Sequence, residues 1–402
     1  MSGAFEAVKV SEHVYWVGAI DWALRDFHGY ATQRGTTYNA YLILADPVIL
    51  VDTVKAAFKD EMLARIASLV DPAKVRWIIS NHSEMDHSGA LPDVVAQLRP
   101  EKVLASKQGR EALARHFHWQ QPVEVVADGQ EIEVGGLHLR FIETPMVHWP
   151  DSMFTMLAED EVLFSNDAFG MHLAGSARFT DQVPPELWRE EAAKYYANIL
   201  MPLSSLIEKL LVRAGELKLS PRIIAPDHGP IHRRRPENIV RLYAQWTQQA
   251  PQRKAVVVHD TMWQSTARMA RAIGEGLAAG GMEVHQMPLA GSHRSDVATE
   301  LLEAGALLVG SPTMNNQIFP TVADTLTYLK GLRPKNLVGA AFGSYGWGGQ
   351  AVGLIEAQLK EMKIDLAAEG VKLQYVPDDE GLKRCRELGE KVAAAVNERM
   401  SA

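Results

Sequence analysis

The sequence predicts two domains of different fold classes: an α+β domain in residues 1–250 and an α/β domain with a parallel sheet in residues 254–402. A chain of 402 residues is long for a single hydrophobic core, so two domains are the prior expectation. Predicted strands come in adjacent pairs between helices in the first part, whereas strands and helices alternate strictly from Lys254 onward. The pattern changes at residues 247–253, a polar stretch with one proline, where we place the boundary.

Short apolar runs bounded by glycine, aspartate or proline predict the strands of the first domain. These runs lie at residues 14–17, 39–44, 48–51, 75–80, 102–105, 137–142, 153–157, 162–164 and 222–225. A helix is expected at residues 57–70, and the Asp-Pro pair that follows ends it. Further helices are expected near residues 185–215, a segment that Pro202 breaks in two. These elements predict two sheets or one large mixed sheet.

Five strand–helix units fill the second domain. The predicted strands lie at residues 255–258, 284–287, 306–310, 337–342 and 372–376, and the helices at residues 265–279, 296–304, 321–332, 350–362 and 380–399. Strict alternation of this kind predicts a doubly wound parallel sheet. Ligands bind such sheets at the carboxyl ends of the strands, so the loops after the strands are the candidate binding site.

The composition of the chain argues against several classes of function. A formal net charge of −8 argues against a general nucleic-acid-binding protein. Cys385 is the single cysteine, which excludes an internal disulfide and a cysteine-based metal site, and fits a reducing cytoplasm. The N-terminus lacks a signal-peptide pattern, and no apolar run approaches the ~20 residues that span a bilayer. We therefore expect a cytoplasmic protein with no nucleic-acid or membrane partner.

Potential metal ligands are concentrated in the stretch Asn-His-Ser-Glu-Met-Asp-His-Ser at residues 81–88, directly after a predicted buried strand. His82, Glu84, Asp86 and His87 are the potential ligands. A hydrophobic core does not hold so many polar groups, because each unpaired one costs several kcal/mol, roughly. The stretch is therefore either a binding site or a solvated loop.

Three distant residues repeat this arrangement, in which a ligand-type side chain follows an apolar run: His148, Asp167 and His228. His28 does so after a shorter run. Each is weak evidence alone, but strand ends on one side of a sheet converge in space. Seven ligands are too many for one four-coordinate zinc and suit two metals with a bridging carboxylate. Imidazole and carboxylate without thiolate favour iron, manganese or zinc.

The loop at residues 82–87 carries a resemblance to a known family. Metallo-β-lactamase-like hydrolases have His-x-His-x-Asp-His here, whereas this chain has His-x-Glu-x-Asp-His, with Glu84 at the second position. That form resembles the flavodiiron proteins, and a harder, more anionic ligand set suits redox chemistry more than hydrolysis. The resemblance implies that one iron is bound by His82, Glu84 and His148, that the other is bound by Asp86 and His228 with or without His87, and that Asp167 bridges them.

Further blocks extend the resemblance, at residues 35–42, 148–153 and 166–170. His28 and Tyr195 resemble catalytic side chains that face the open side of the diiron site. Tyr196 is the alternative to Tyr195.

Hydroxyl groups are abundant in the loop at residues 260–266, which runs into a predicted helix. Backbone N–H groups and the helix dipole favour an anion there, and the loop has no lysine of the kind found in ATP-binding P-loops. The loops at 310–316 and 343–349 add glycines that allow close approach to a flat ligand, and Trp263, Tyr345 and Trp347 can stack on it.

This set of loops resembles flavodoxins, which implies FMN. The FMN contacts are expected from Thr261, Met262, Trp263, Gln264, Ser265, Thr266, Ser311, Pro312, Thr313, Asn315, Asn316, Ser344, Tyr345, Gly346, Trp347 and Gly348.

Taken together, the resemblance implies a metallo-β-lactamase-like (αββα) domain followed by a flavodoxin-like domain with a five-stranded parallel sheet. It implies an enzyme that reduces O2 to water and/or NO to N2O at a non-haem diiron centre fed with electrons through FMN. Family members are head-to-tail homodimers, so a homodimer or a dimer of dimers is expected. One cysteine cannot build a rubredoxin iron site, so we expect the two-domain class. The external electron donor is left open between rubredoxin, a reduced deazaflavin and an NADH-linked reductase.

Two alternatives stand beside this interpretation. The first is a binuclear metallo-hydrolase fused to a flavodoxin module, against which Glu84 argues. The second is an electron-transfer flavoprotein whose metal domain is only structural.

Overall fold

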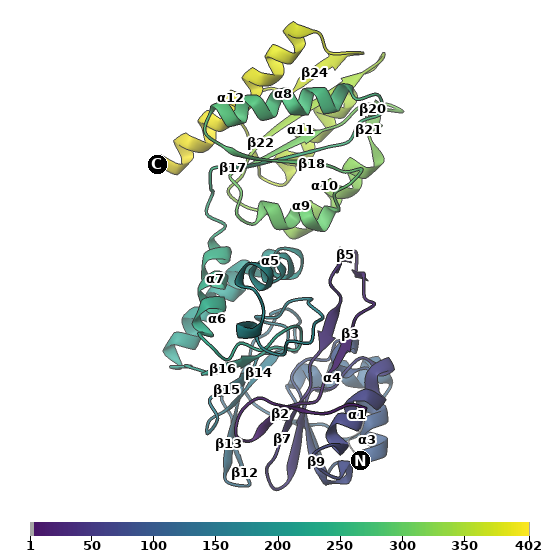
Figure 1. Cartoon of the computed structure of the whole chain (residues 1–402), viewed down its shortest axis with the longest axis vertical. Helices are drawn as coiled ribbons and strands as arrows, with labels where there is room; N and C mark the ends of the chain where they lie inside the picture. The colour runs from purple at the N-terminus through teal and green to yellow at the C-terminus, as the bar shows by residue number, and fades with distance from the viewer. Residues whose placement is uncertain (1–3, 402) are drawn as a thin grey trace. The chain divides into compact units, whose positions relative to one another are not determined.

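The computed structural model describes residues 4–401 (Figure 1). Proximity between Cα atoms divides the chain into two compact units. The first contains the residues up to His28, Thr32–Tyr195 and Ser205–Ala244, and the second contains Gly29–Ala31, Tyr196–Ser204 and the chain from Gln245 onward.

The first unit is built on two sheets. A mixed sheet has the order β1 (Val8–Lys9), β2 (Val14–Trp16), β7 (Tyr41–Ile43), β8 (Val48–Val51), β9 (Val75–Ser80), β10 (Lys102–Ala105) and β11 (Glu124–Val125). A second sheet has the order β12 (Glu131–Val134), β13 (Leu137–Glu143), β14 (Met153–Leu157), β15 (Val162–Phe164) and β16 (Ile223–Ala225). Short strands β3 (Ala19–Asp21) and β6 (Thr36–Tyr38) pair with each other, while β4 (Asp26–Phe27) and β5 (Tyr30–Ala31) lie between them in sequence. Of the two arrangements expected, two sheets is therefore the one observed.

The two sheets bury their facing sides against each other. Tyr41 from β7 and Phe164 from β15 belong to one buried cluster, with ring centroids 5.2 Å apart. Side chains alternate along a strand, so Leu42 points to the other face, where it joins a cluster with Met62 and Val94 from helices. The mixed sheet is thus buried on both faces, and its strand ends are held rigidly.

Seven α-helices belong to this part of the chain: α1 (Lys59–Ala67), α2 (Met85–Ser88), α3 (Leu91–Leu98), α4 (Lys107–Phe117), α5 (Pro185–Tyr195), α6 (Ser204–Glu216) and α7 (Glu237–Gln248). Pro202 lies between α5 and α6 in the short 3₁₀ turn Met201–Leu203, as expected from its lack of a backbone donor. Helices α2, α4 and α7 were not expected from the sequence pattern, and α2 lies within residues 81–88, which were expected to form a loop. Helix α4 buries only Gly109 and Leu113, which gives little apolar periodicity.

The second unit is a doubly wound parallel sheet. Its order is β18 (Glu283–Pro288), β17 (Lys254–His259), β19 (Ala306–Gly310) and β22 (Val338–Tyr345), and both β23 (Asp365–Leu366) and β24 (Val371–Gln374) pair with β22. The fifth position of the sheet is therefore shared by two short strands. The alternation is also interrupted by the small hairpin of β20 (Thr313–Met314) and β21 (Gln317–Ile318).

Five helices belong to this sheet: α8 (Ser265–Ala279), α9 (Arg294–Leu301), α10 (Pro320–Leu332), α11 (Gln350–Glu361) and α12 (Asp379–Ser401). Helices α8 and α12 lie side by side (Figure 1), and Ile273 and Leu388 join one buried cluster with Val257 of β17. Because β17, β19 and β22 are parallel neighbours, the loops that follow them meet at one edge of the sheet.

Candidate metal centre and flavin pocket

The loop after β9 is fixed by hydrogen bonds to its neighbours before any metal is considered. The backbone N–H and the side-chain amide of Asn81 donate to the two carboxylate oxygens of Asp52, at 2.7 and 2.8 Å. The side-chain carbonyl of Asn81 accepts a hydrogen bond of 2.7 Å from the hydroxyl of Thr155 in β14. The N–H of Ser83 donates to Asp151 at 2.7 Å. These bonds orient the loop toward the ends of the second sheet.

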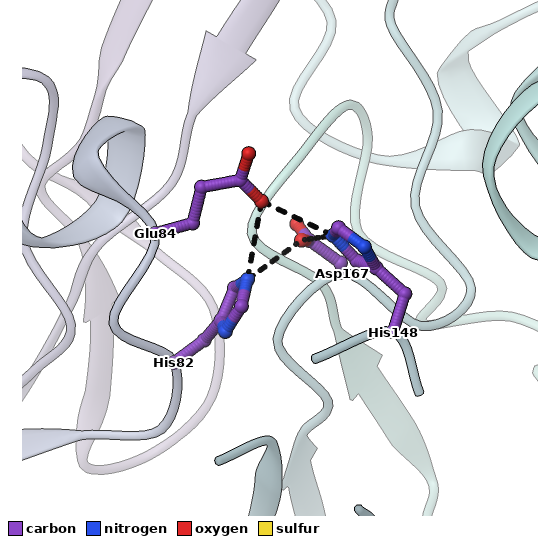
Figure 2. Close-up of side chains that lie close together, drawn as sticks. All are labelled: His82, Glu84, His148 and Asp167. Carbon is purple, nitrogen blue, oxygen red and sulfur yellow. Dashed lines mark hydrogen bonds and ion pairs between the residues drawn. The ribbon is translucent and has the colours of Figure 1, made fainter. Parts of the chain in front are cut away.

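A first cluster joins two side chains of this loop with two distant ones (Figure 2): His82, Glu84, His148 and Asp167. The Nε2 atom of His148 lies 2.9 Å from Asp167 Oδ2 and 3.2 Å from Glu84 Oε2. The Nε2 atom of His82 lies 3.3 Å from Glu84 Oε2 and 3.5 Å from Asp167 Oδ2. Four potential ligand atoms thus converge on one point.

A second cluster contains Asp86, His87 and His228. The Nε2 atom of His228 lies 3.2 Å from Asp86 Oδ2, and that of His87 lies 3.1 Å from Asp167 Oδ1. Asp167 therefore presents Oδ2 to the first cluster and Oδ1 to the second. Both imidazoles of this cluster also turn Nε2 toward the shared carboxylate, at 3.4 Å in the case of His228.

The clusters bury carboxylates and imidazoles side by side, and each kind of group shifts the pKa of the other. Burial alone would raise the pKa of Glu84, but the imidazoles of His148 and His82 bring that pKa down to about 2. Burial alone would lower the pKa of His82, but Asp151 and Glu84 raise it to about 10. The metal-free site thus holds ionised carboxylates beside protonated imidazoles, which is the charge pattern that bound cations would replace.

Buried atoms without a hydrogen-bond partner also fit bound metal. Within residues 4–401, both carboxylate oxygens of Asp86, Oδ1 of Asp167 and Nε2 of His87 are buried and make no hydrogen bond. Such orphaned groups are costly unless a ligand satisfies them. Imidazole nitrogen and carboxylate oxygen are a donor set suited to iron, so the residues present fit a two-iron site.

The stability of the metal-free protein should fall as pH rises. The pKa of His82 is raised above its unfolded value of about 6.5, so its contribution is fully present below that pH and is lost as pH rises through about 10. We expect the Tm of chelator-treated protein to decline between pH 6.5 and 10, measured by calorimetry. The metal-loaded protein is the control, because metal binding replaces the protons. An equal decline in both forms, or a rise in the metal-free form, contradicts this expectation.

His28 and Tyr195 lie at the edges of the two clusters. The Nε2 atom of His28 is 3.4 Å from Glu84 Oε1, and 76% of its side chain is exposed. The ring of Tyr195 is buried, with its centroid 6.0 Å from that of His228. Tyr196, the alternative, directs its hydroxyl to Ser204 at 3.0 Å.

Sequence reasoning missed several buried polar residues around the clusters. Thr36 Oγ1 lies 2.8 Å from Nδ1 of His172 and 3.3 Å from Nδ1 of His228. Asp151 and Asp227 were also missed, although each lies within three residues of a predicted ligand in the sequence. That proximity is the signal that could have drawn attention to them.

A cavity of about 610 Å³ lies at the carboxyl edge of the parallel sheet. Its lining is Met262, Trp263, Ser265, Pro312, Thr313, Asn315, Asn316, Ser344, Tyr345, Gly346, Trp347, Gly348, Tyr375 and Val376. Twelve of these were expected, and Tyr375 and Val376 were missed. Trp263 and Trp347 are 88% and 92% exposed, so the cavity has an open aromatic rim.

Four expected contact residues do not line the cavity: Thr261, Gln264, Thr266 and Ser311. Thr266 and Ser311 are engaged within the protein, since Thr266 Oγ1 lies 2.9 Å from Ser344 Oγ and Ser311 Oγ accepts from the N–H of Phe319 at 2.9 Å. The Oγ1 atom of Thr261, four residues before the start of α8 in sequence, is buried and makes no hydrogen bond to the described residues. A helix N-terminus that follows such a hydroxyl fits the phosphate of a flavin nucleotide.

Comparison with known proteins agrees with this architecture. Residues 36–229 match the family model described as ODP family beta lactamase, and residues 257–389 match the flavodoxin model. The nitric oxide reductase of Moorella thermoacetica is 49% identical over 97% of this chain and 99% of that protein. The rubredoxin-oxygen oxidoreductase of Megalodesulfovibrio gigas is 41% identical over 99% of this chain and 100% of that protein. The coenzyme F420H2 oxidase of Methanothermobacter marburgensis is 39% identical over 97% of this chain and 98% of that protein.

Solved structures give the same result. Rubredoxin oxygen:oxidoreductase from Desulfovibrio gigas superposes with a TM-score of 0.97, at 41% identity over 99% of this chain and 100% of that chain. The flavodiiron protein from Giardia intestinalis superposes with a TM-score of 0.96, at 32% identity over 100% of this chain and 99% of that chain.

The fold and the two sites thus define an oxidoreductase that joins a metallo-β-lactamase-like domain to a flavodoxin-like domain, as the sequence predicted. The chain belongs to the flavodiiron protein family. Its flavodoxin domain implies FMN, and the buried cluster is consistent with a diiron site. Among residues 4–401, none of the helices is both long and apolar enough to cross a membrane.

Proposed function

We propose that this protein reduces O2 to water, NO to N2O, or both, at a non-haem diiron centre that receives electrons through FMN. The observation that carries the proposal is the position of Asp167, whose two oxygens lie 2.9 Å from His148 and 3.1 Å from His87. A carboxylate shared by two ligand clusters suits a pair of metals held close together. Three relatives support the same reaction class through their names: a nitric oxide reductase, a rubredoxin-oxygen oxidoreductase and a coenzyme F420H2 oxidase.

The ligand roles follow from the two clusters. His82, Glu84 and His148 would hold one iron, Asp86, His87 and His228 would hold the other, and Asp167 would be a ligand shared by both. When bound, the irons would bind the gas and store electrons, and FMN would divide two-electron input into single electrons. Hydrolases of this fold have histidine at the position of Glu84. The negative charge of Glu84 stabilises ferric iron, and it therefore favours redox chemistry at iron over hydrolysis at zinc.

Two side chains hold protons for the reaction, because reduction of either gas consumes as many protons as electrons. His28 reaches from solvent to within 3.4 Å of Glu84, so it exchanges protons with water and passes them to the site. Burial, reinforced by the charge of Asp167, keeps the pKa of Tyr195 well above its usual range. Tyr195 therefore stays a neutral phenol with its ring beside that of His228, and a neutral phenol is able to donate a hydrogen bond.

We assign metal chemistry to residues 1–250 and flavin binding to residues 254–402. The cavity at the carboxyl edge of the parallel sheet would hold the flavin, and the backbone N–H groups at the N-terminus of α8, with Thr261, would bind its phosphate. Trp263, Tyr345 and Trp347 would provide aromatic surfaces for its ring.

The aromatic rim also supports assembly of the protein into a head-to-tail homodimer. Two tryptophans that are 88% and 92% exposed at the mouth of one cavity are unusual on a monomer. A head-to-tail homodimer, or a dimer of dimers, covers this rim with the metal domain of the partner. Sedimentation of active holoprotein solely as a monomer would exclude such an assembly.

The electron donor is an external carrier. The printed names of two relatives point to rubredoxin and to the reduced deazaflavin coenzyme F420H2, and we propose one of these chemical classes for this chain. The single cysteine, which cannot form an internal disulfide, supports a reducing cytoplasmic location.

Metal analysis combined with anaerobic stopped-flow spectroscopy tests the proposed function. We expect two irons and one FMN per chain, and rapid reoxidation of the reduced holoprotein when O2 or NO is added. The apoprotein reloaded with zinc is the matched control, since it keeps the fold but lacks a redox metal. Two zincs in the native protein with hydrolytic turnover would instead establish the fused hydrolase. Equal gas turnover by the iron and zinc forms would establish a flavoprotein with a structural metal domain.

A further inference from the structure

Each histidine of the 82–87 loop has a second buried carboxylate behind it. Nδ1 of His82 lies 3.5 Å from Oδ1 of Asp151, and Nδ1 of His87 lies 3.8 Å from Oδ2 of Asp227. In both rings the other nitrogen, Nε2, points into the metal clusters. The two carboxylates are not among the seven proposed ligands.

The two contacts follow one pattern along the chain. Asp151 lies three residues after His148, a proposed ligand of the iron that His82 also binds. Asp227 directly precedes His228, a proposed ligand of the iron that His87 also binds. Each distant segment therefore supplies one ligand to an iron and one carboxylate to the loop histidine at that same iron.

The backbone of Asp227 is fixed by hydrogen bonds, whereas its carboxylate makes no hydrogen bond to the described residues. Its backbone N–H donates to the carbonyl of Asn166 at 2.8 Å, and its carbonyl accepts from the N–H of Asn39 at 2.7 Å. Both of its carboxylate oxygens are buried and make no hydrogen bond to any described residue. Nδ1 of His87 is likewise buried without a hydrogen bond, so the two unsatisfied groups face each other.

The main chain of His87 is fixed independently of its ring. Its carbonyl accepts from the N–H of Thr53 at 3.0 Å and from the Thr53 hydroxyl at 2.5 Å. The remaining freedom is rotation of the imidazole, which decides whether Nε2 or another atom faces the iron. A histidine that binds metal through Nε2 carries its proton on Nδ1 and needs an acceptor for it.

We propose that Asp227 is the positioning residue that makes His87 a ligand of its iron, and that Asp151 has the same role for His82. The proposal rests on the proposed two-iron function. In each case the carboxylate accepts a hydrogen bond from the Nδ1–H group, which fixes the tautomer and the orientation of the ring that binds the metal. His87 is the ligand whose participation the sequence left open, and Asp227 is the residue that settles it.

A double-mutant cycle in the FMN-loaded holoprotein tests this role. Iron affinities are measured by equilibrium competition with a ferrous chelator in wild type, Asp227→Ala, His87→Ala and the double variant. We expect Asp227→Ala to weaken one of the two irons by about 10- to 100-fold and to leave the other unchanged. Because Asp227 acts through His87, the double variant should match His87→Ala within about twofold.

Asp151→Ala serves as the matched control within the same site. Combined with His87→Ala, it should add its own loss, again about 10- to 100-fold, at the other iron. Mössbauer spectra of ⁵⁷Fe-loaded protein should show altered parameters for one iron in Asp227→Ala and for the other in Asp151→Ala. A purely structural defect would alter both irons and would lower flavin content as well.

Asp227→Asn covers the case in which the alanine variant does not fold, since asparagine keeps an acceptor oxygen and the shape of the side chain. It should lose less iron affinity than alanine and still change the spectrum of one iron only. Wild-type affinities and spectra in Asp227→Asn and Asp227→Ala, or additive losses with His87→Ala, overturn the proposal. Failure of the wild-type protein to bind two irons would instead overturn the proposed function.

Discussion

Replacing Asp167 by alanine is expected to lower the rate of O2 and NO reduction by about 10³-fold or more while FMN stays bound. The two oxygens of this buried carboxylate face separate clusters, at 2.9 Å from His148 and 3.1 Å from His87. Its loss removes one ligand from each iron and leaves the neighbouring imidazoles without their shared anion. A loss of roughly 4 kcal/mol of transition-state stabilisation corresponds to that change in rate. Steady-state gas consumption with an artificial reductant measures the effect.

Asp128→Ala is the matched control for this variant. Asp128 is a partly exposed carboxylate that pairs with Arg213, far from any proposed ligand in sequence, and such a pair contributes at most about 1 kcal/mol. Its variant should keep iron, FMN and turnover. Turnover by Asp167→Ala close to that of the wild type, with flavin and protein concentration matched, would show that the site does not carry the reaction.

Replacing Ser265 by glutamate is expected to weaken FMN binding by about 10²-fold or more and to stop donor-driven turnover, while both irons remain bound. Ser265 opens α8 and lines the cavity, so a carboxylate there competes with the flavin phosphate for the same backbone N–H groups. Loss of a charge-assisted interaction of roughly 3 kcal/mol corresponds to this change in affinity. Fluorescence titration of the flavin-free protein with FMN measures it.

Two further variants separate charge from disruption of the fold. Ser265→Ala removes the hydroxyl without adding charge and should weaken FMN binding by only about tenfold or less. Thr327→Glu places the same new charge on the exposed face of α10 and should leave FMN binding unchanged. If Ser265→Glu binds FMN as tightly as the alanine variant, the phosphate does not lie at this helix terminus.

The sequence predicted which side chains form the two clusters because of one local rule, that a ligand-type side chain follows an apolar run. This rule found His82, His148, Asp167 and His228 without knowledge of the fold. The rule alone does not sort them into two clusters, because the direction of each Asp167 oxygen depends on how the loop after β15 turns. The family resemblance implied that division, and the structure brings together two clusters with the same members.

Residues that contact the proposed ligands, such as Asp227, were harder to predict because their contacts depend on the direction in which each side chain points. Asp227 adjoins His228, and no property of the sequence shows that the two side chains face different partners. Likewise, Tyr375 lines the cavity only because β24 pairs with β22 and places its end beside Tyr345, the last residue of β22. Thr266 was expected to contact FMN, and the sequence pattern did not show that its hydroxyl lies 2.9 Å from that of Ser344.

The metal clusters are assembled from four separate segments, which begin after β9, before β14, after β15 and after β16. Ions bound there cross-link positions as far apart in sequence as His82 and His228, and they are lost when the chain unfolds. Closing long loops removes entropy from the unfolded chain much as a disulfide does, and Cys385 alone cannot provide one. Iron bound by these residues would therefore also stabilise the folded domain, because the ions are released when the chain unfolds.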